Sequence, residues 1–115
     1  MRIDVNCDGR LDAVFTGRTN VHHVIAAAID RPGGAPKISH VEFALTGASQ
    51  DALCGVPEPL REELLTDDIV EQTAVAPEGI VRSKRCVGLE LRSGECDAFH
   101  IFWNHKANEL SWWHL

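Results

Sequence analysis

The chain has 115 residues, with 17 Asp and Glu side chains against 11 Lys and Arg, so its formal net charge is -6 at pH 7. A chain of this length can form one domain that buries roughly two-thirds of its unfolded surface without a disulfide or a structural metal. The acidic balance argues against a general nucleic-acid-binding surface, and no apolar run is long enough to span a membrane. We therefore expect a single domain over residues 1–115 that binds neither nucleic acid nor a membrane.

The N-terminus predicts a cytoplasmic protein. The first six residues, Met-Arg-Ile-Asp-Val-Asn, contain no apolar signal-peptide core. The chain has four cysteines, and no two of them are spaced as Cys-x-x-Cys, so neither a zinc ribbon nor a redox motif is favoured. In the cytoplasm we expect all of them to be reduced. They are Cys7, Cys54, Cys86 and Cys96.

Residues 4–12 form the most distinctive motif, Asp-Val-Asn-Cys-Asp-Gly-Arg-Leu-Asp. Oxygen-bearing side chains alternate around a glycine, as they do in loops that bind Ca²⁺. The carbonyl group of Arg10 would supply a further oxygen. The candidate side-chain ligands are Asp4, Asn6, Asp8 and Asp12.

This run resembles the calcium loops of FG-GAP propeller repeats, which read D-x-[DN]-x-D-G-x-x-D and continue into a short apolar strand, here residues 13–15. It is less similar to dockerin and EF-hand loops, because Phe15 stands where those loops carry an Asp or Glu at the twelfth position. The resemblance covers about a tenth of the chain, and no second copy is present, whereas a propeller needs several repeats. It implies a loop type and no particular fold.

The same residues also fit a β-hairpin. If residues 7–9 are a three-residue loop with Gly9 in the left-handed conformation, Asp4 lies opposite Asp12 and Ile3 lies opposite Ala13. A cation or a nearby arginine would relieve the repulsion between the two aspartates. This register places one set of apolar side chains on a single face of the hairpin: Ile3, Val5, Leu11, Ala13 and Phe15.

The centre of the chain predicts two helices and one strand. Residues 20–31 have apolar side chains at helical spacing until residues 32–34, Pro-Gly-Gly, end the pattern. Residues 37–45 alternate as a half-buried strand does, with the odd-numbered side chains on one face. Pro59 is tolerated in a first helical turn, so residues 59–65 are expected to form a second, shorter helix.

The C-terminal third predicts a three-stranded meander. Residues 79–92 and 96–104 have strand character and are separated by a two-residue turn, Ser93-Gly94. Residues 109–115 return as the third strand. This register places Leu91 opposite Cys96, so Cys86 and Cys96 would point to opposite faces without forming a disulfide.

The predicted fold class is therefore α+β: a mostly antiparallel sheet of about five strands with one long and one short helix. The middle strand of the meander, residues 98–103, is apolar on both faces, which indicates that both faces of the sheet are covered. The second face could be covered by the short helix and its loop, by a second copy of the chain, or by a ligand. The interface or pocket residues are then Phe99, His100, Ile101, Trp103, Leu110, Trp112 and Trp113.

Other polar residues give weaker signals. His22 and His23 are adjacent on the predicted helix and therefore do not converge on one metal. His40 and Glu42 share a strand face and could form an acid–base or metal pair, although such spacing often occurs by chance. The acidic residues between positions 58 and 71 fit a solvated helix face or a surface for a basic protein: Glu58, Glu62, Glu63, Asp67, Asp68 and Glu71.

The sequence contains no motif that identifies a catalytic residue, so enzymatic activity is left open. We predict a non-catalytic binding module, homodimeric through the aromatic C-terminal sheet. One alternative is a small ligand-binding protein or enzyme with a pocket for an apolar ligand, lined by His100 and the C-terminal tryptophans. Another is an acidic antagonist of a basic partner protein. No cofactor is expected, apart from Ca²⁺ at the loop of residues 4–12.

Overall fold

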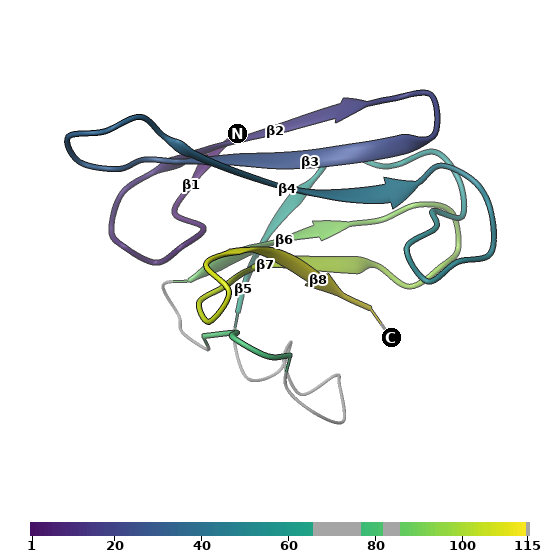
Figure 1. Cartoon of the computed structure of the whole chain (residues 1–115). Helices are drawn as coiled ribbons and strands as arrows, with labels where there is room; N and C mark the ends of the chain where they lie inside the picture. The colour runs from purple at the N-terminus through teal and green to yellow at the C-terminus, as the bar shows by residue number, and fades with distance from the viewer. Residues whose placement is uncertain (66–76, 82–85, 115) are drawn as a thin grey trace.

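The computed structural model describes residues 1–65, 77–81 and 86–114, and none of these residues is helical. Within these described ranges, eight strands form two four-stranded antiparallel sheets, which lie one above the other (Figure 1). The N-terminal sheet consists, in spatial order, of β1 (Arg2–Ile3), β2 (Asp12–Arg18), β3 (His22–Ile29) and β4 (Lys37–Ala44). The C-terminal sheet consists, also in order, of β5 (Arg61–Leu64), β6 (Val87–Leu91), β7 (Phe99–Asn104) and β8 (Glu109–Trp113).

The prediction of an α+β fold is therefore wrong, and the long helix is the main error. Residues 22–29 form β3, which pairs with both β2 and β4. Ile25, Ala27 and Ile29 are buried at a spacing of two, and Ile25 and Ile29 also satisfy the helical spacing. Pairing on both sides of a central strand outweighs the helix propensity of its three alanines.

The predicted short helix is also a strand. Residues 61–64 form β5, which pairs with β6 and extends the C-terminal sheet by one strand. Of the acidic residues predicted on a solvated helix face, Glu62 is exposed, whereas the side chain of Glu63 is only 9% exposed. Positions 67, 68 and 71 lie outside the described residues.

The N-terminal hairpin forms with a different register from the predicted one. Ile3 pairs with Asp12 and Arg2 with Ala13, a shift of one residue, and residues 4–11 form a long loop between the strands. A one-residue shift moves every side chain of a strand to the opposite face. As a result Asp12 is buried, while Phe15 is 57% exposed. Gly9 adopts the predicted left-handed conformation, with φ of 86°.

The prediction for residues 37–45 is confirmed over β4. Ser39, Val41 and Phe43 are buried, and the even-numbered residues between them are exposed. The C-terminal meander of β6, β7 and β8 is also confirmed in strand order. Its first register differs by three residues from the prediction, because Leu91 pairs with Phe99 instead of Cys96.

The core lies between the inner faces of the two sheets. Phe43 on β4 contacts Phe99 on β7, with ring centroids 4.5 Å apart, and Phe99 meets Trp112 on β8 edge to face at 5.2 Å. The sheets also meet along one edge, where the hydroxyl group of Ser39 accepts a hydrogen bond of 2.9 Å from the backbone N–H of Leu110. The N-terminal sheet therefore covers the inner aromatic face of the meander.

Two disulfides join parts of the chain that belong to different sheets. Cys7, in the loop between β1 and β2, is bonded to Cys86, which immediately precedes β6. Cys54, after β4, is bonded to Cys96, in the loop between β6 and β7. Cys86 and Cys96 do not pair with each other, as predicted, but the expectation of reduced cysteines is wrong, since no cysteine is free. Within the described residues there is no helix of the length and hydropathy needed to cross a membrane.

Candidate functional site

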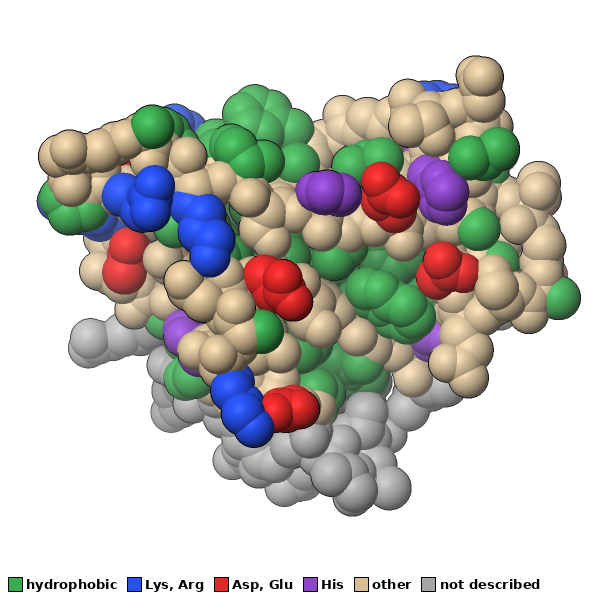
Figure 2. Space-filling model, viewed as in Figure 1, with side chains coloured by type: hydrophobic (Ala, Val, Ile, Leu, Met, Phe, Trp, Pro, Cys, Tyr) green, Lys and Arg blue, Asp and Glu red, His purple; other side chains and the backbone are tan. Residues whose placement is uncertain are grey.

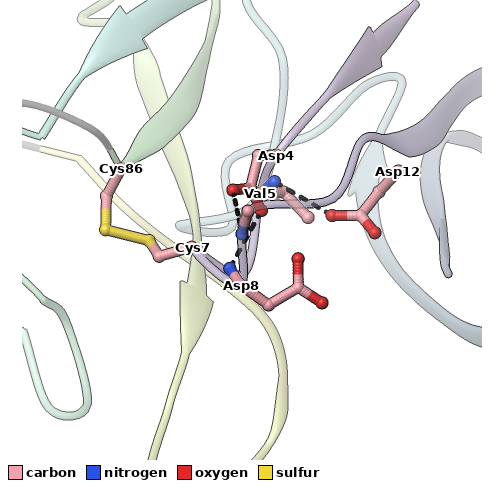
Figure 3. Close-up of a disulfide and its surroundings, with 7 residues drawn as sticks. Asp4, Val5, Cys7, Asp8, Asp12 and Cys86 are labelled. Carbon is pink, nitrogen blue, oxygen red and sulfur yellow. Dashed lines mark hydrogen bonds between the residues drawn. A yellow bond between two sulfur atoms is a disulfide. The ribbon is translucent and has the colours of Figure 1, made fainter. Parts of the chain in front are cut away.

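The loop of residues 4–11 is organised by its own carboxylates (Figure 3). The two carboxylate oxygens of Asp4 accept hydrogen bonds from the backbone N–H groups of Asp8, at 3.1 Å, and Gly9, at 2.7 Å. The carboxylate of Asp8 in turn accepts a bond of 2.8 Å from the N–H of Arg10 and one of 3.3 Å from the side-chain amide of Asn6. These contacts are those of a tight polar turn, in which carboxylates satisfy backbone donors.

Asp12 has a different environment from the three other predicted ligands. It is fully buried, and its two oxygens accept hydrogen bonds from the N–H groups of Val5, at 3.1 Å, and Asp30, at 3.0 Å. Burial raises its pKa above the ordinary value, and the two hydrogen bonds oppose this effect. The structure thus separates Asp12 from the exposed part of the loop, and calcium binding by these four residues stays a prediction.

The predicted aromatic site is divided between the two faces of the C-terminal sheet. Five of its residues point into the core, where they pack against each other and against the N-terminal sheet: Phe99, Ile101, Trp103, Leu110 and Trp112. His100 and Trp113 lie on the opposite, outer face, where their rings stack with centroids 4.1 Å apart. The seven residues therefore do not line one pocket.

Two grooves lie among the described residues. One, of about 460 Å³, lies between β2 and residues 57–60, and the other, of about 360 Å³, lies beside the disulfide of Cys54 and Cys96. Neither is lined by His100 or by a tryptophan. The predicted tryptophan pocket does not correspond to either of these grooves.

The outer face of the C-terminal sheet instead holds a cluster of ionisable side chains around His100. The register places Glu90, His100 and Trp113 side by side on β6, β7 and β8. Nδ1 of His100 lies 2.7 Å from Oε1 of Glu63 on β5, and these two side chains are 8% and 9% exposed. The donor atoms of Glu63, Glu90 and His100 all lie within 4.8 Å of one another. We call these three residues the Glu–His cluster.

Gly88 lies on β6, the strand between Glu63 and His100, and a leucine side chain packs against it. Gly88 is the partner of Glu63 on the intervening strand, and cross-strand partners share a face of the sheet. A Cβ atom at position 88 would lie 2.7 Å from Cδ2 of Leu65, so the side chain of Leu65 occupies the space that the glycine leaves. Glu63 reaches His100 diagonally across β6, beside Leu65.

Glu90 is held from the side by an arginine. Arg92, directly after the end of β6, donates from Nε to Oε1 of Glu90 at 2.6 Å. This hydrogen bond is the largest cause that lowers the pKa of Glu90, and the charge of Arg92 adds to it, so the carboxylate is ionised at neutral pH. The side chain of Arg92 is 53% exposed and that of Glu90 is 16% exposed.

Two buried polar atoms of this region have no hydrogen-bond partner among the described residues. They are Oε2 of Glu63 and Nε1 of Trp113, and they belong to the two side chains that contact the ring of His100. A buried polar atom without a partner costs about 1–3 kcal/mol, or more when it belongs to a charged group. This deficit marks the Glu–His cluster as a candidate site.

The outer face of the N-terminal sheet has an unusual composition for a solvated surface. It combines alanines on the central strand β3 with exposed apolar side chains on the flanking strands, and Phe15 and Ile38 are 57% and 64% exposed. Figure 2 shows hydrophobic side chains at the top of the molecule, over this sheet, beside histidine and acidic side chains. We call this surface the outer N-terminal face: Ala13, Phe15, Val24, Ala26, Ala28, Ile38, His40 and Glu42.

The remaining predicted histidine pairs lie on this face or at its edge. Nε2 of His40 lies 3.5 Å from Oε1 of Glu42, as their shared strand face predicted. His22 also approaches Glu42, at 3.9 Å, whereas His23 points into the groove beside β2. All three members of the His22, His40 and Glu42 group are at least 35% exposed, so solvent screens their interactions.

Comparison with protein-family models, with curated protein sequences and with solved structures finds no match for this chain. Functional inference therefore depends on the geometry of its own residues.

Sequence reasoning identified His100 but missed its partners. Glu63 was placed on a helix, where its side chain could not be related to β7. Glu90 gave the one usable signal, because it is a charged residue inside an otherwise apolar strand, Val-Gly-Leu-Glu-Leu. A charged side chain on a covered face of a sheet needs a hydrogen-bonding or oppositely charged partner.

Proposed function

We propose that this chain is a non-catalytic binding module that pairs with a second copy of itself through the outer N-terminal face. The observation that supports the proposal is the apolar character of this face. An antiparallel sheet with one face in a core normally presents polar side chains on the other. Here β3, the strand at the middle of the face, presents Val24, Ala26 and Ala28.

The shape of the outer N-terminal face favours a second copy of the chain as its binding partner. In one row across the sheet Phe15, Ala26 and His40 are neighbours, and in another Ala13, Ala28 and Ile38 are neighbours. The large side chains of Phe15, Ile38 and His40 therefore stand around a floor of alanines. Under a two-fold axis, the large side chain of one copy lies over the alanine floor of the other. Sheets packed in this way cross at about 30°.

Charge supports the same arrangement. His40 and Glu42 lie on β4 at the edge of the face and carry opposite charges when the histidine is protonated. Because a two-fold axis brings identical surfaces together in opposite directions, His40 of one copy can face Glu42 of the other. The face carries no other acidic group to oppose this pairing.

Sedimentation or light scattering over a range of protein concentrations tests the proposal. We expect the native chain to dimerise and Phe15→Lys to be monomeric. The variant should keep the thermal midpoint that the native chain has at concentrations too low for dimerisation, since Phe15 is outside the core. Val56→Ser is the matched control, because Val56 is 86% exposed and belongs to none of the strands. A native chain that stays monomeric at high concentration, or a Phe15→Lys variant that still dimerises, would contradict the proposal.

We also infer that the chain works in an oxidising compartment. Disulfides form and persist in secreted and periplasmic proteins and are rare in the cytoplasm. Both bridges of this chain have Cα–Cα distances, 5.1 and 5.9 Å, in the range typical of disulfides. Oxidised cysteines support a location opposite to the cytoplasmic one expected from the sequence. Thiol titration of the chain purified from its native source without reducing agent tests this, and free thiols would contradict it.

A further inference from the structure

We propose that the Glu–His cluster binds one divalent transition-metal ion through Glu63, Glu90 and His100. This site is on the outer face of the C-terminal sheet and does not depend on the proposed self-association. Its ligands come from three adjacent strands, β5, β6 and β7, which are hydrogen-bonded to one another. The backbone therefore fixes their relative positions before any ion binds.

The distances within the cluster are close to those of a coordination sphere. The three donor atoms lie within 4.8 Å of one another. Two donors of a tetrahedral ion with bonds of about 2.0–2.1 Å are about 3.3 Å apart. The donor atoms must therefore approach one another by up to about 1.5 Å. Glu90, the most exposed of the three side chains, can supply this movement by a change of side-chain torsion angles.

The state of Glu63 is independent evidence for a ligand. Its side chain is 9% exposed, one oxygen contacts His100, and the other has no partner among the described residues. A carboxylate is rarely buried with a free oxygen, because the charge loses its hydration without compensation. An ion bound between Glu63 and Glu90 would supply that compensation.

The donor set selects the class of metal. One imidazole nitrogen and two carboxylates suit Zn²⁺ and the neighbouring transition metals, whereas Ca²⁺ and Mg²⁺ require oxygen donors alone. The cysteines do not compete, since all are in disulfides. Three protein ligands leave one position of a tetrahedral ion for water.

Two arginines compete with a bound metal ion for the carboxylate of Glu90. Arg92 is hydrogen-bonded to Glu90, and Arg61 is the partner of Glu90 on β5, so both present positive charge to the same carboxylate. Binding requires Glu90 to exchange its contact with Arg92 for the metal. Removal of the Arg92 charge should therefore strengthen metal binding, whereas a merely structural role for the Glu63–His100 pair predicts no such effect.

Calorimetric titration of the chelator-treated, disulfide-intact chain with zinc chloride tests the proposal. We expect one ion per chain, with affinity lowered by about tenfold or more in Glu63→Gln and Glu90→Gln and raised several-fold in Arg92→Gln. Zinc should also raise the thermal midpoint of the native chain but not of the two glutamate variants. If Glu63→Gln fails to fold, Glu90→Gln decides, because its side chain is nearer the surface.

His40→Gln is the matched control, because His40, His22 and Glu42 form an exposed group that could bind zinc at the surface. We expect this variant to bind zinc as the native chain does. The proposal is overturned if His40→Gln abolishes binding while Glu90→Gln does not, or if the native chain binds no zinc at millimolar concentration. A chain that dimerises but binds no zinc would contradict the metal site alone. The zinc titration and the dimerisation measurement therefore test the two proposals separately.

Discussion

Asp12 connects three segments of the N-terminal sheet through two hydrogen bonds. Its carboxylate accepts the N–H of Val5, in the loop after β1, and that of Asp30, directly after β3. We expect Asp12→Ala to lower the free energy of unfolding by about 2–3 kcal/mol, because one buried and one partly buried backbone donor lose their acceptor. Asp8→Ala is the control, since Asp8 is exposed, and its cost should stay below about 1 kcal/mol. Urea unfolding measures both, and equal costs would contradict the structural role of Asp12.

Arg92 and Glu90 give a pH-dependent contribution to stability. The pKa of Glu90 is lowered from its ordinary 4.5, mainly by the hydrogen bond from Arg92. A carboxyl whose pKa is lower in the folded state stabilises the fold above its unfolded pKa, and this contribution is lost as the pH falls through the folded pKa. Arg92→Gln should therefore be less stable than the native chain at pH 7, and the difference should vanish below the lowered pKa. Urea unfolding from pH 7 to pH 3 checks this, and a constant difference would contradict it.

Single residues of the candidate site were only partly predictable. His100 stands out in the sequence because it is polar within an apolar strand, and the structure places it in the Glu–His cluster. Its contact with Glu63 spans 37 positions of the chain and two strands of the sheet. No local pattern encodes such a contact, because it depends on the register of two strand pairs.

At the scale of elements, β6 packs too closely for any residue other than glycine at position 88. A Cβ atom at this position would lie 2.7 Å from Cδ2 of the buried Leu65 and 2.9 Å from the carbonyl oxygen of Ile101. We expect Gly88→Ala to lower the free energy of unfolding by about 1–3 kcal/mol, since the strands must shift. Gly17→Ala on β2 is the matched control, because no atom lies within 4 Å of its added Cβ. Its effect should be within about 0.5 kcal/mol. Thermal unfolding compares the two, and a stable Gly88→Ala variant would contradict the packing.

The elements that the sequence predicted correctly are those with an unambiguous period. β4 alternates strictly, and the meander has long β-rich runs, so both were recognisable. β3 contains His-His-Val-Ile-Ala-Ala-Ala-Ile, in which three alanines favour a helix while Ile25 and Ile29 satisfy both periods. Only its pairing with β2 and β4 decides the outcome, and that information is not local.

The hairpin registers were wrong for a related reason. Turn residues near Gly9 and Gly94 predicted short loops, but Cys7 and Cys96 in these loops are bonded to distant cysteines. Loops that reach across to another sheet are longer than the turn alone requires, so residues 4–11 separate β1 from β2. The shift in register then exposes Phe15 and creates the outer N-terminal face.

At the scale of the whole molecule, the disulfides hold the two sheets together. Each bridge connects a segment that precedes or follows a strand of the N-terminal sheet with one that flanks β6, and they span 79 and 42 positions of the chain. In the chain-entropy model, closing loops of these lengths restricts the unfolded state by about 4 kcal/mol each. This is a large part of the total stability of a small domain, which is about 5–15 kcal/mol.

Removal of either disulfide should therefore destabilise the chain by about 4 kcal/mol. The two disulfides differ in whether their removal also opens a cavity. Cys86 is buried with Leu65, Phe102 and Trp113, so Cys7→Ala with Cys86→Ala also opens a small cavity beside the Glu–His cluster. Cys54 is exposed, so Cys54→Ala with Cys96→Ala should cost less. Denaturant unfolding with and without a reducing agent measures both. The reductant should destabilise the native chain most, because the native chain loses two bridges. It should destabilise each double variant less, because each has one bridge left to lose. The quadruple alanine variant should be unaffected. A native chain that is insensitive to reduction would show that the core between the sheets holds them together without the bridges.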